Sequence, residues 1–165
     1  MISQDDIDGL LDVPHLTPPQ MLCQFMKAFK GSLDSRLWIK LVIEEMAELR
    51  VEDLGTVEHL KEFSDVLYVM MGLQMTIPLS FEIMISEDEV KEINELEAKL
   101  DEVVEKYTKY YTPDVVAEAF FRVHESNMSK LGLDGKPILR EDGKVLKGPN
   151  YKKPDLTDLI KKDAR

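Results

Sequence analysis

The hydrophobic and polar positions of the chain follow a helical period along most of its length. Between residues 33 and 51, apolar side chains recur every three or four positions, at Leu33, Leu37, Trp38, Leu41, Val42, Met46 and Leu49. The same spacing, bounded by Pro, Gly and Thr, predicts further helices over residues 17–30, 56–77, 87–110 and 113–131. Strand-like alternation is absent over most of the chain. The pattern predicts an all-α fold, a bundle of four to five helices.

One of these helices is too apolar to pack on one side only. Its second half reads VLYVMMGLQM, from Val66 to Met75, and carries apolar side chains all round. Such a helix needs burial inside a bundle or against another subunit. We therefore expect a homodimer or a dimer of dimers.

The two ends of the chain differ from its centre. Three prolines indicate a loosely ordered lead-in over residues 1–19. Near the other end, the pairs Asp134-Gly135 and Asp142-Gly143 bracket two short extended pieces. This predicts a β-hairpin or an ordered loop. A chain of 165 residues is expected to form one domain, with a helical core over 17–131 and a tail over 132–165.

Charge is distributed unevenly. The net charge is −11, yet residues 122–165 hold 11 basic against 7 acidic residues. An acidic body argues against a nucleic-acid partner, because phosphate backbones need clustered positive charge. An acidic centre with a basic tail suits a small polyphosphate that carries a divalent metal.

Localisation signals favour a soluble, cytoplasmic protein with no membrane partner. No apolar run approaches the roughly 20 residues of a membrane span, and MISQDDIDGLLD lacks the basic start of a signal peptide. Cys23 is the single cysteine, so no intrachain disulfide can form.

Carboxylates lie on the apolar face of the helix over 33–51. With Leu37 set at 0°, the apolar arc extends to about 140° at Val42. Glu48 falls at about 20° and Glu45 at about 80°, within the arc. Glu44, at about 340°, lies on its edge. We expect these glutamates to point inward, with Glu44 at the rim.

The next helix also carries carboxylates beside apolar positions. These are Glu62 and Asp65, which share one face. A buried, unpaired carboxylate costs several kcal/mol, so a cation is needed. Lys61 is nearby in sequence, while Lys40 and Arg50 point away from the acidic face. A hard divalent metal is the better candidate.

The residue types narrow the choice of metal. Oxygen ligands without His or Cys favour Mg²⁺, Mn²⁺ or Ca²⁺ over zinc. An EF-hand loop and the Glu-x-x-His pairs of di-iron bundles are both missing from the sequence. Mg²⁺ keeps waters and bridges to phosphate oxygens, so a nucleotide or another polyphosphate is the expected substrate.

As a motif, Glu44-Glu45-x-x-Glu48, 13 residues, then Glu62-x-x-Asp65 resembles the signature of the MazG-like, all-α nucleoside triphosphate pyrophosphohydrolases. VHESNMSKL and DGKVLKGPNYKKPDL also resemble the C-terminal motifs of one MazG-like subgroup. Compared with members of that family, the chain has what looks like an insertion over residues 80–111.

The resemblance implies an enzyme that hydrolyses nucleoside triphosphates between the α- and β-phosphates, with Mg²⁺ or Mn²⁺, to the monophosphate and pyrophosphate. It implies that Glu45, Glu48, Glu62 and Asp65 bind metal and that Glu44 activates the attacking water. Some phage-type members prefer purine deoxynucleotides such as dGTP and dATP, in nucleotide-pool control.

The motif match also implies a set of substrate-binding residues. Asn127 and Lys130 share a helix face, and lysines of the tail suit phosphate as flexible point charges. Tyr151 and Trp38 are candidates to stack on a base, although Trp38 also fits the core pattern. The full set is Asn127, Lys130, Lys144, Lys147, Tyr151 and Trp38.

Other functions remain open at this point. Phosphoribosyl-ATP cleavage and pyrimidine dNTP hydrolysis use the same scaffold or the same carboxylates. A non-catalytic helical module, whose acidic face binds a partner or a structural Ca²⁺, fits the same acidic helices.

Overall fold

The computed structural model describes residues 16–31, 33–81 and 86–163, and these residues form an all-helical fold. Over this part of the chain there are six helices: α2 (Pro18–Phe29), α3 (Ser35–Val51), α4 (Val57–Phe81), α5 (Glu87–Thr108), α6 (Pro113–Met128) and α7 (Thr157–Asp163). The predicted all-α bundle is confirmed at this level.

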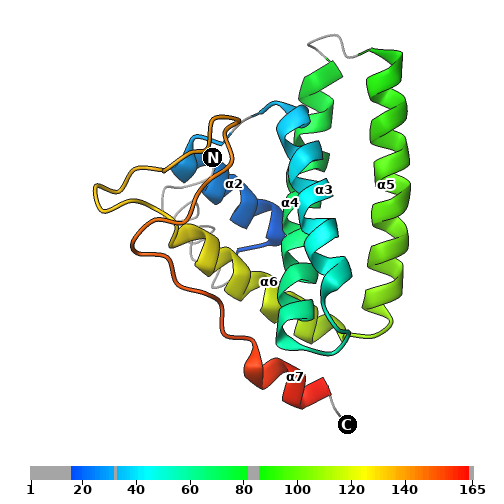
Figure 1. Cartoon of the computed structure of the whole chain (residues 1–165), viewed down its shortest axis with the longest axis vertical. Coiled ribbons are helices and arrows are strands. Elements are labelled where there is room, and N and C mark those ends of the chain that lie inside the picture. The colour runs from blue at the N-terminus through cyan, green and yellow to red at the C-terminus, as the bar shows by residue number, and fades with distance from the viewer. Residues whose placement is uncertain (1–15, 32, 82–85, 164–165) are drawn as a thin grey trace, which may run out of the picture.

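Helix α4 is the centre of the bundle. It packs against α3, its most extensive partner, and against α2, α5 and α6. In Figure 1, α3, α4 and α5 run side by side along the long axis, while α2 and α6 lie beside them at an angle. The chain after α6 runs back along the α2 and α6 side and ends in α7 (Figure 1). The site described below lies between this tail and the α3–α4 pair.

Local sequence signals begin the central helices where the pattern predicted. The backbone N–H of Arg36 donates to Asp34 Oδ1 at 3.0 Å at the start of α3. The backbone N–H of His59 donates to Thr56 Oγ1 at 3.1 Å at the start of α4. These side chains satisfy backbone donors that have no partner within the first helical turn.

The predicted end of α4 before Pro78 is wrong. The helix continues through Pro78 to Phe81. Proline removes one backbone hydrogen bond, to the carbonyl four residues earlier. That residue is Gln74, which is exposed, so water can bind its carbonyl instead.

The tail is an ordered loop with a short hairpin-like segment, as predicted. Leu139 and Val145 form an isolated antiparallel bridge. The backbone N–H of Arg140 donates to the carbonyl of Lys144, and that of Leu146 to the carbonyl of Ile138, both at 2.8 Å. Helix α7 was not predicted, because seven residues are too few for a helical period to stand out. The lead-in expected over 1–19 falls mostly outside the described residues.

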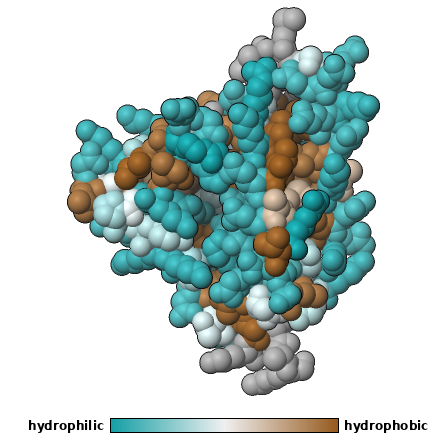
Figure 2. Space-filling view, viewed as in Figure 1, coloured by the Kyte–Doolittle hydropathy of each residue, from teal (hydrophilic) through white to brown (hydrophobic). Residues whose placement is uncertain are grey.

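The apolar half of α4 is only partly covered. Tyr68 and Leu73 are buried, whereas Leu67, Met70 and Met71 are half-buried. Figure 2 shows hydrophilic residues over most of one face, with an apolar stripe in the region where Figure 1 draws α3 and α5. The expected homodimer or dimer of dimers stays a prediction, as does the view of residues 80–111 as an insertion.

No helix within the described residues combines the length and the apolar character needed to cross a membrane.

Close packing of α3 on α4 depends on Gly72. Trp38 is 3% exposed and its ring lies so close to Gly72 that a Cβ atom there would overlap the ring. Trp38 is thus a core residue, as its place in the apolar pattern indicated. Its ring also lines a pocket described below.

Replacing Gly72 by alanine should lower the free energy of unfolding by about 1–3 kcal/mol, because the added methyl group displaces the Trp38 ring. Urea unfolding followed by the emission of Trp38, the single tryptophan of the chain, measures this change. Gln74→Ala, at an exposed position of the same helix, is the control and should change stability by less than about 0.5 kcal/mol. If Gly72→Ala left the free energy of unfolding unchanged, this would contradict the close contact between Gly72 and the Trp38 ring.

Candidate functional site

Helices α3 and α4 bring three of the predicted carboxylates together. One oxygen each of Glu45, Glu48 and Glu62 lies within 4.8 Å of the others. The two helices are joined by the short segment 52–56, so they pack against each other with their acidic positions side by side. Oxygen atoms at this separation fit the ligand shell of one hard divalent cation.

The three carboxylates differ in burial. Glu62 is 8% exposed, Glu45 is half-buried and Glu48 is exposed. The prediction that Glu48 points inward is therefore wrong as a statement of burial. Helical geometry gives the direction of a side chain but not what lies along it, and Glu48 meets an open cleft there. Glu48 forms the solvent side of the cluster.

Glu62 holds an unsatisfied oxygen. Among the described residues, its Oε2 atom is buried and has no hydrogen-bond partner within the protein. Burial is the main cause of a raised pKa for the Glu62 carboxyl, and the charges of Asp65 and Glu48 add to it. An unpaired buried carboxylate oxygen beside two other carboxylates is the arrangement that a bound cation would satisfy.

Lys61 already supplies one positive charge to the cluster. Its Nζ atom lies 2.7 Å from Glu62 Oε1 and 2.7 Å from Asp65 Oδ2. Burial lowers the pKa of Lys61, but the charges and hydrogen bonds of Asp65 and Glu62 outweigh it and raise the pKa above its usual value. From the sequence, Lys61 was a weaker candidate than a metal to balance these charges. In the structure Lys61 does pair with the acidic face, because its side chain extends along α4 to Asp65, one turn away.

Glu45 lies where burial and negative charge act together. Burial, followed by the charge of Asp65, raises the pKa of Glu45 to about 7, while Lys144 acts in the opposite direction. The Lys144 Nζ atom is 3.8 Å from Glu45 Oε1, too far for a hydrogen bond. Glu45 is thus poorly compensated by the protein alone.

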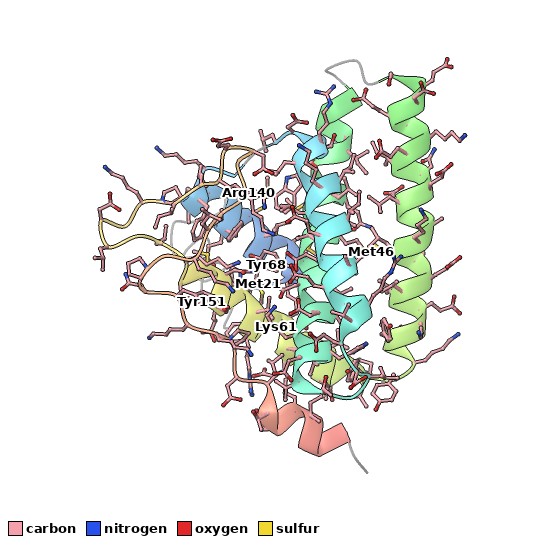
Figure 3. The ribbon with its side chains drawn as sticks, viewed as in Figure 1. Met21, Met46, Lys61, Tyr68, Arg140 and Tyr151 are labelled. Atoms are coloured by element: carbon pink, nitrogen blue, oxygen red, sulfur yellow. The ribbon has the colours of Figure 1, made fainter. Side chains whose placement is uncertain are left out.

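Most of the predicted site residues line a cleft of about 530 Å³. Its walls come from α3, α4, α6 and the tail, and Figure 3 shows Lys61, Arg140 and Tyr151 on this side of the molecule. The predicted residues that line it are Glu45, Glu48, Asp65, Asn127, Lys130, Lys144, Lys147 and Tyr151. The cleft joins an acidic wall to a basic one.

The tail is held against the end of α6 at close range. The backbone N–H of Gly148 donates to the Lys130 carbonyl at 3.1 Å, and a Cβ atom at Gly148 would collide with that carbonyl oxygen. Ser126 Oγ donates to the carbonyl of Lys152 at 2.7 Å, and the N–H of Lys152 donates to Ser129 Oγ at 2.8 Å. These contacts carry the tail lysines to the cleft.

Glu44, the residue expected to activate water, is bound by the tail. Its Oε1 accepts from Arg140 at 2.9 Å and its Oε2 accepts from Lys144. The hydrogen bond from Lys144 is the main cause of a lowered pKa for Glu44. Arg140 was missed by the sequence analysis, although its place between the two Asp-Gly turns of the basic tail was a usable signal. Asp142 holds the same guanidinium at 2.7 Å.

The basic wall contains lysines in different environments. Lys147 lies 4.8 Å from the centre of the Tyr151 ring, a cation–π contact. Lys130 is half-buried, and burial lowers its pKa although Asp65 and Glu45 act to raise it. Lys130 therefore faces the carboxylates from across the cleft.

A smaller pocket adjoins the cleft and shares several of its walls. Its apolar lining includes Phe25, Leu37, Trp38 and Tyr68, and it shares Glu45, Asp65, Asn127, Lys130 and Lys144 with the cleft. Trp38 is thus brought beside the other predicted site residues, although it is buried. An aromatic and aliphatic pocket next to charged walls suits a flat, apolar ring.

A buried hydrogen-bond chain joins Tyr68, His124 and Gln24. The hydroxyl oxygen of Tyr68 lies 2.9 Å from His124 Nδ1. His124 Nε2 lies 2.9 Å from Gln24 Oε1. Gln24 Oε1 can only accept, so His124 Nε2 carries the proton and Tyr68 donates to Nδ1. Tyr68 and Asn127 both line the smaller pocket. Burial lowers the pKa of His124, which keeps it neutral in this structural role.

Comparison with family models, with curated proteins and with solved structures gave no match. The functional assignment therefore depends on the motif residues and on the geometry of the cleft.

Replacing Glu45 by glutamine should stabilise the metal-free protein at pH 8 by about 2–3 kcal/mol, because an ionised, poorly compensated carboxylate is removed. The pKa of Glu45 in the folded protein, about 7, lies above the ordinary value of 4.5 for a glutamate carboxyl. Its contribution to stability is thus present below pH 4.5 and is lost as pH rises through 7. Urea unfolding with a chelator at pH 5 and pH 8 measures this difference.

At pH 5 the stability gained by Glu45→Gln should fall below about 1 kcal/mol. Glu92→Gln, at an exposed position of α5, is the control and should show no such pH dependence. An equal gain at both pH values would show that Glu45 is not the titrating group.

Proposed function

We propose that the protein is a Mg²⁺- or Mn²⁺-dependent nucleotide pyrophosphohydrolase with a MazG-like fold, which releases pyrophosphate from (deoxy)nucleoside triphosphates. The observation that carries this proposal is the meeting of Glu45, Glu48 and Glu62 within 4.8 Å, with a buried unpaired oxygen on Glu62. The same cleft has lysines on its opposite wall, as a metal-bound polyphosphate requires.

The residues present fit a hard divalent cation. Glu45, Glu48 and Glu62 would hold it, and Asp65 lines the same cleft. Ligands that are all carboxylate oxygens suit Mg²⁺ or Mn²⁺. A divalent cation supplies Lewis acidity there, which makes the attacking water more acidic and offsets charge on the phosphate oxygens.

The basic wall would bind the triphosphate. Lys130, Lys144 and Lys147 line the cleft across from the carboxylates, and Arg140 adds a planar guanidinium. These groups offset negative charge that builds up on the leaving pyrophosphate. The buried amide of Asn127 offers a hydrogen-bonding group at the same wall.

Glu44 would take the proton of the attacking water. As the water oxygen bonds to the α-phosphorus, its proton moves to the Glu44 carboxylate, the bond to the bridging oxygen breaks and pyrophosphate leaves. Glu44 is engaged by Arg140 and Lys144 in the structure. Proton transfer therefore needs these two side chains to turn toward the triphosphate, whose greater negative charge attracts them.

The smaller pocket, whose volume is about 70 Å³, would widen to receive the base. Trp38 and Tyr68 contribute aromatic rings to it, and it opens beside the carboxylates. Its apolar lining holds a ring by packing and sets few hydrogen-bond requirements. The choice of substrate therefore needs an assay that tests purine deoxynucleotides, pyrimidine deoxynucleotides and phosphoribosyl-ATP separately.

A non-catalytic helical module is the second candidate, and the Lys61 ion pairs favour it. Lys61 compensates Glu62 and Asp65 without any metal, as in a purely structural charge cluster. This alternative leaves the unpaired Oε2 atom of Glu62 and the lysine-lined cleft without a role.

Glu48→Gln and Asp65→Asn should each reduce pyrophosphate release by at least about a hundredfold while leaving the fold intact, because both remove a charge facing the cleft. Colorimetric pyrophosphate detection with dNTPs, NTPs and phosphoribosyl-ATP measures activity, and circular dichroism measures folding. Glu92→Gln on α5 is the control and should retain activity.

Retained activity in both variants would remove the metal assignment. No turnover of any of these substrates by the wild-type protein, with metals changing only its melting temperature, would favour the structural module.

A further inference from the structure

The ammonium group of Lys61 lies between two carboxylates, where a metal site would normally hold its ion. Its Nζ atom bridges Glu62 Oε1 and Asp65 Oδ2, each at 2.7 Å. These carboxylates come from successive turns of α4, and one of them belongs to the group that could hold a cation. The lysine, Glu62 and Asp65 side chains are 18%, 11% and 16% exposed.

The lysine compensates the cluster only in part. Glu62 Oε2 stays buried without a hydrogen-bond partner in the part of the chain that the structure describes, even though its other oxygen is bound by Lys61. Among the described residues, Glu45 has an ion pair with Lys144 only, whose Nζ atom is 3.8 Å from its Oε1 atom. One positive charge therefore faces several carboxylates, and the arrangement remains attractive to a divalent ion.

The surroundings give the Lys61 side chain a second place to go. Lys61 lines the 530 Å³ cleft, together with Lys130, Lys144 and Lys147 on the basic wall. A flexible four-carbon stem allows its ammonium group to turn from the carboxylates into the cleft without movement of the helix. In the cleft it would meet phosphate oxygens.

We propose that Lys61 is the resident cation of the metal site, which holds Glu62 and Asp65 before a divalent metal binds and is displaced into the cleft when the metal loads. The inference rests on the proposed metal site and adds its regulation. Because displacement opposes loading, bare metal binds weakly. Triphosphate favours loading, because it gives the displaced ammonium a new partner.

The first test is the affinity for Mn²⁺ without nucleotide, measured by isothermal titration calorimetry on the full chain. Lys61→Gln should bind Mn²⁺ at least about tenfold more tightly than the wild type, because a competing positive charge that contacts Glu62 is removed. Lys61→Arg keeps the charge and should remain near the wild-type affinity. Arg50→Gln is the control, since it makes the same change in net charge at an exposed position of α3.

The second test uses the wild-type protein, so that it does not depend on whether Lys61→Gln folds. Lysine acetylation, quantified by mass spectrometry, should increase several-fold at Lys61 when Mn²⁺ saturates the site, because the ammonium group leaves its ion pairs. Lys91 is the internal control, with a side chain that is 77% exposed. Its labelling should not change.

The outcomes separate this inference from the proposed function. If Mn²⁺ binds but Lys61 labelling stays constant or falls, or if Lys61→Gln binds no more tightly than Arg50→Gln, the displacement is wrong and the metal site stands. If no variant binds Mn²⁺ and no nucleotide is hydrolysed, both proposals are overturned together.

Discussion

Negative charge held between α3 and α4 is the constraint on which the rest of the site depends. Carboxylates replace apolar side chains at positions that face a neighbouring helix, so each must be protonated, paired or bound to a cation. The protein itself supplies two of these: burial raises the pKa of Glu45, and Lys61 pairs with Glu62 and Asp65. Among the described residues, the Oε2 atom of Glu62 is buried and has no hydrogen-bond partner in the protein.

The tail acts on the same charge from the other side. Gly148 lets it approach α6 closely, and Arg140 and Lys144 then reach Glu44 across nearly a hundred residues of sequence. The site therefore has an acidic wall made by two adjacent helices and a basic wall made by the end of α6 and the tail. A polyphosphate with a divalent cation is the class of ligand that matches both walls at once.

Prediction from sequence succeeded where the signal is local and periodic. The apolar spacing located the five longer helices, and the angles around α3 correctly placed Glu45 toward the cluster. It failed for Glu48, whose direction was right but whose surroundings are open, and for the end of α4 beyond Pro78. Arg140 was missed because an isolated basic residue in a loop has no periodic context.

The sequence by itself determined where the five longer helices lie and which carboxylates share a face, because both follow from the 3.6-residue period of a single helix. Only the tertiary structure decided how those charges are compensated. Lys61 pairs with Asp65 within one turn of α4, but the tail brings Arg140 and Lys144 to Glu44 from a distant part of the sequence. Such long-range contacts depend on packing in three dimensions, which residue spacing along the chain does not determine.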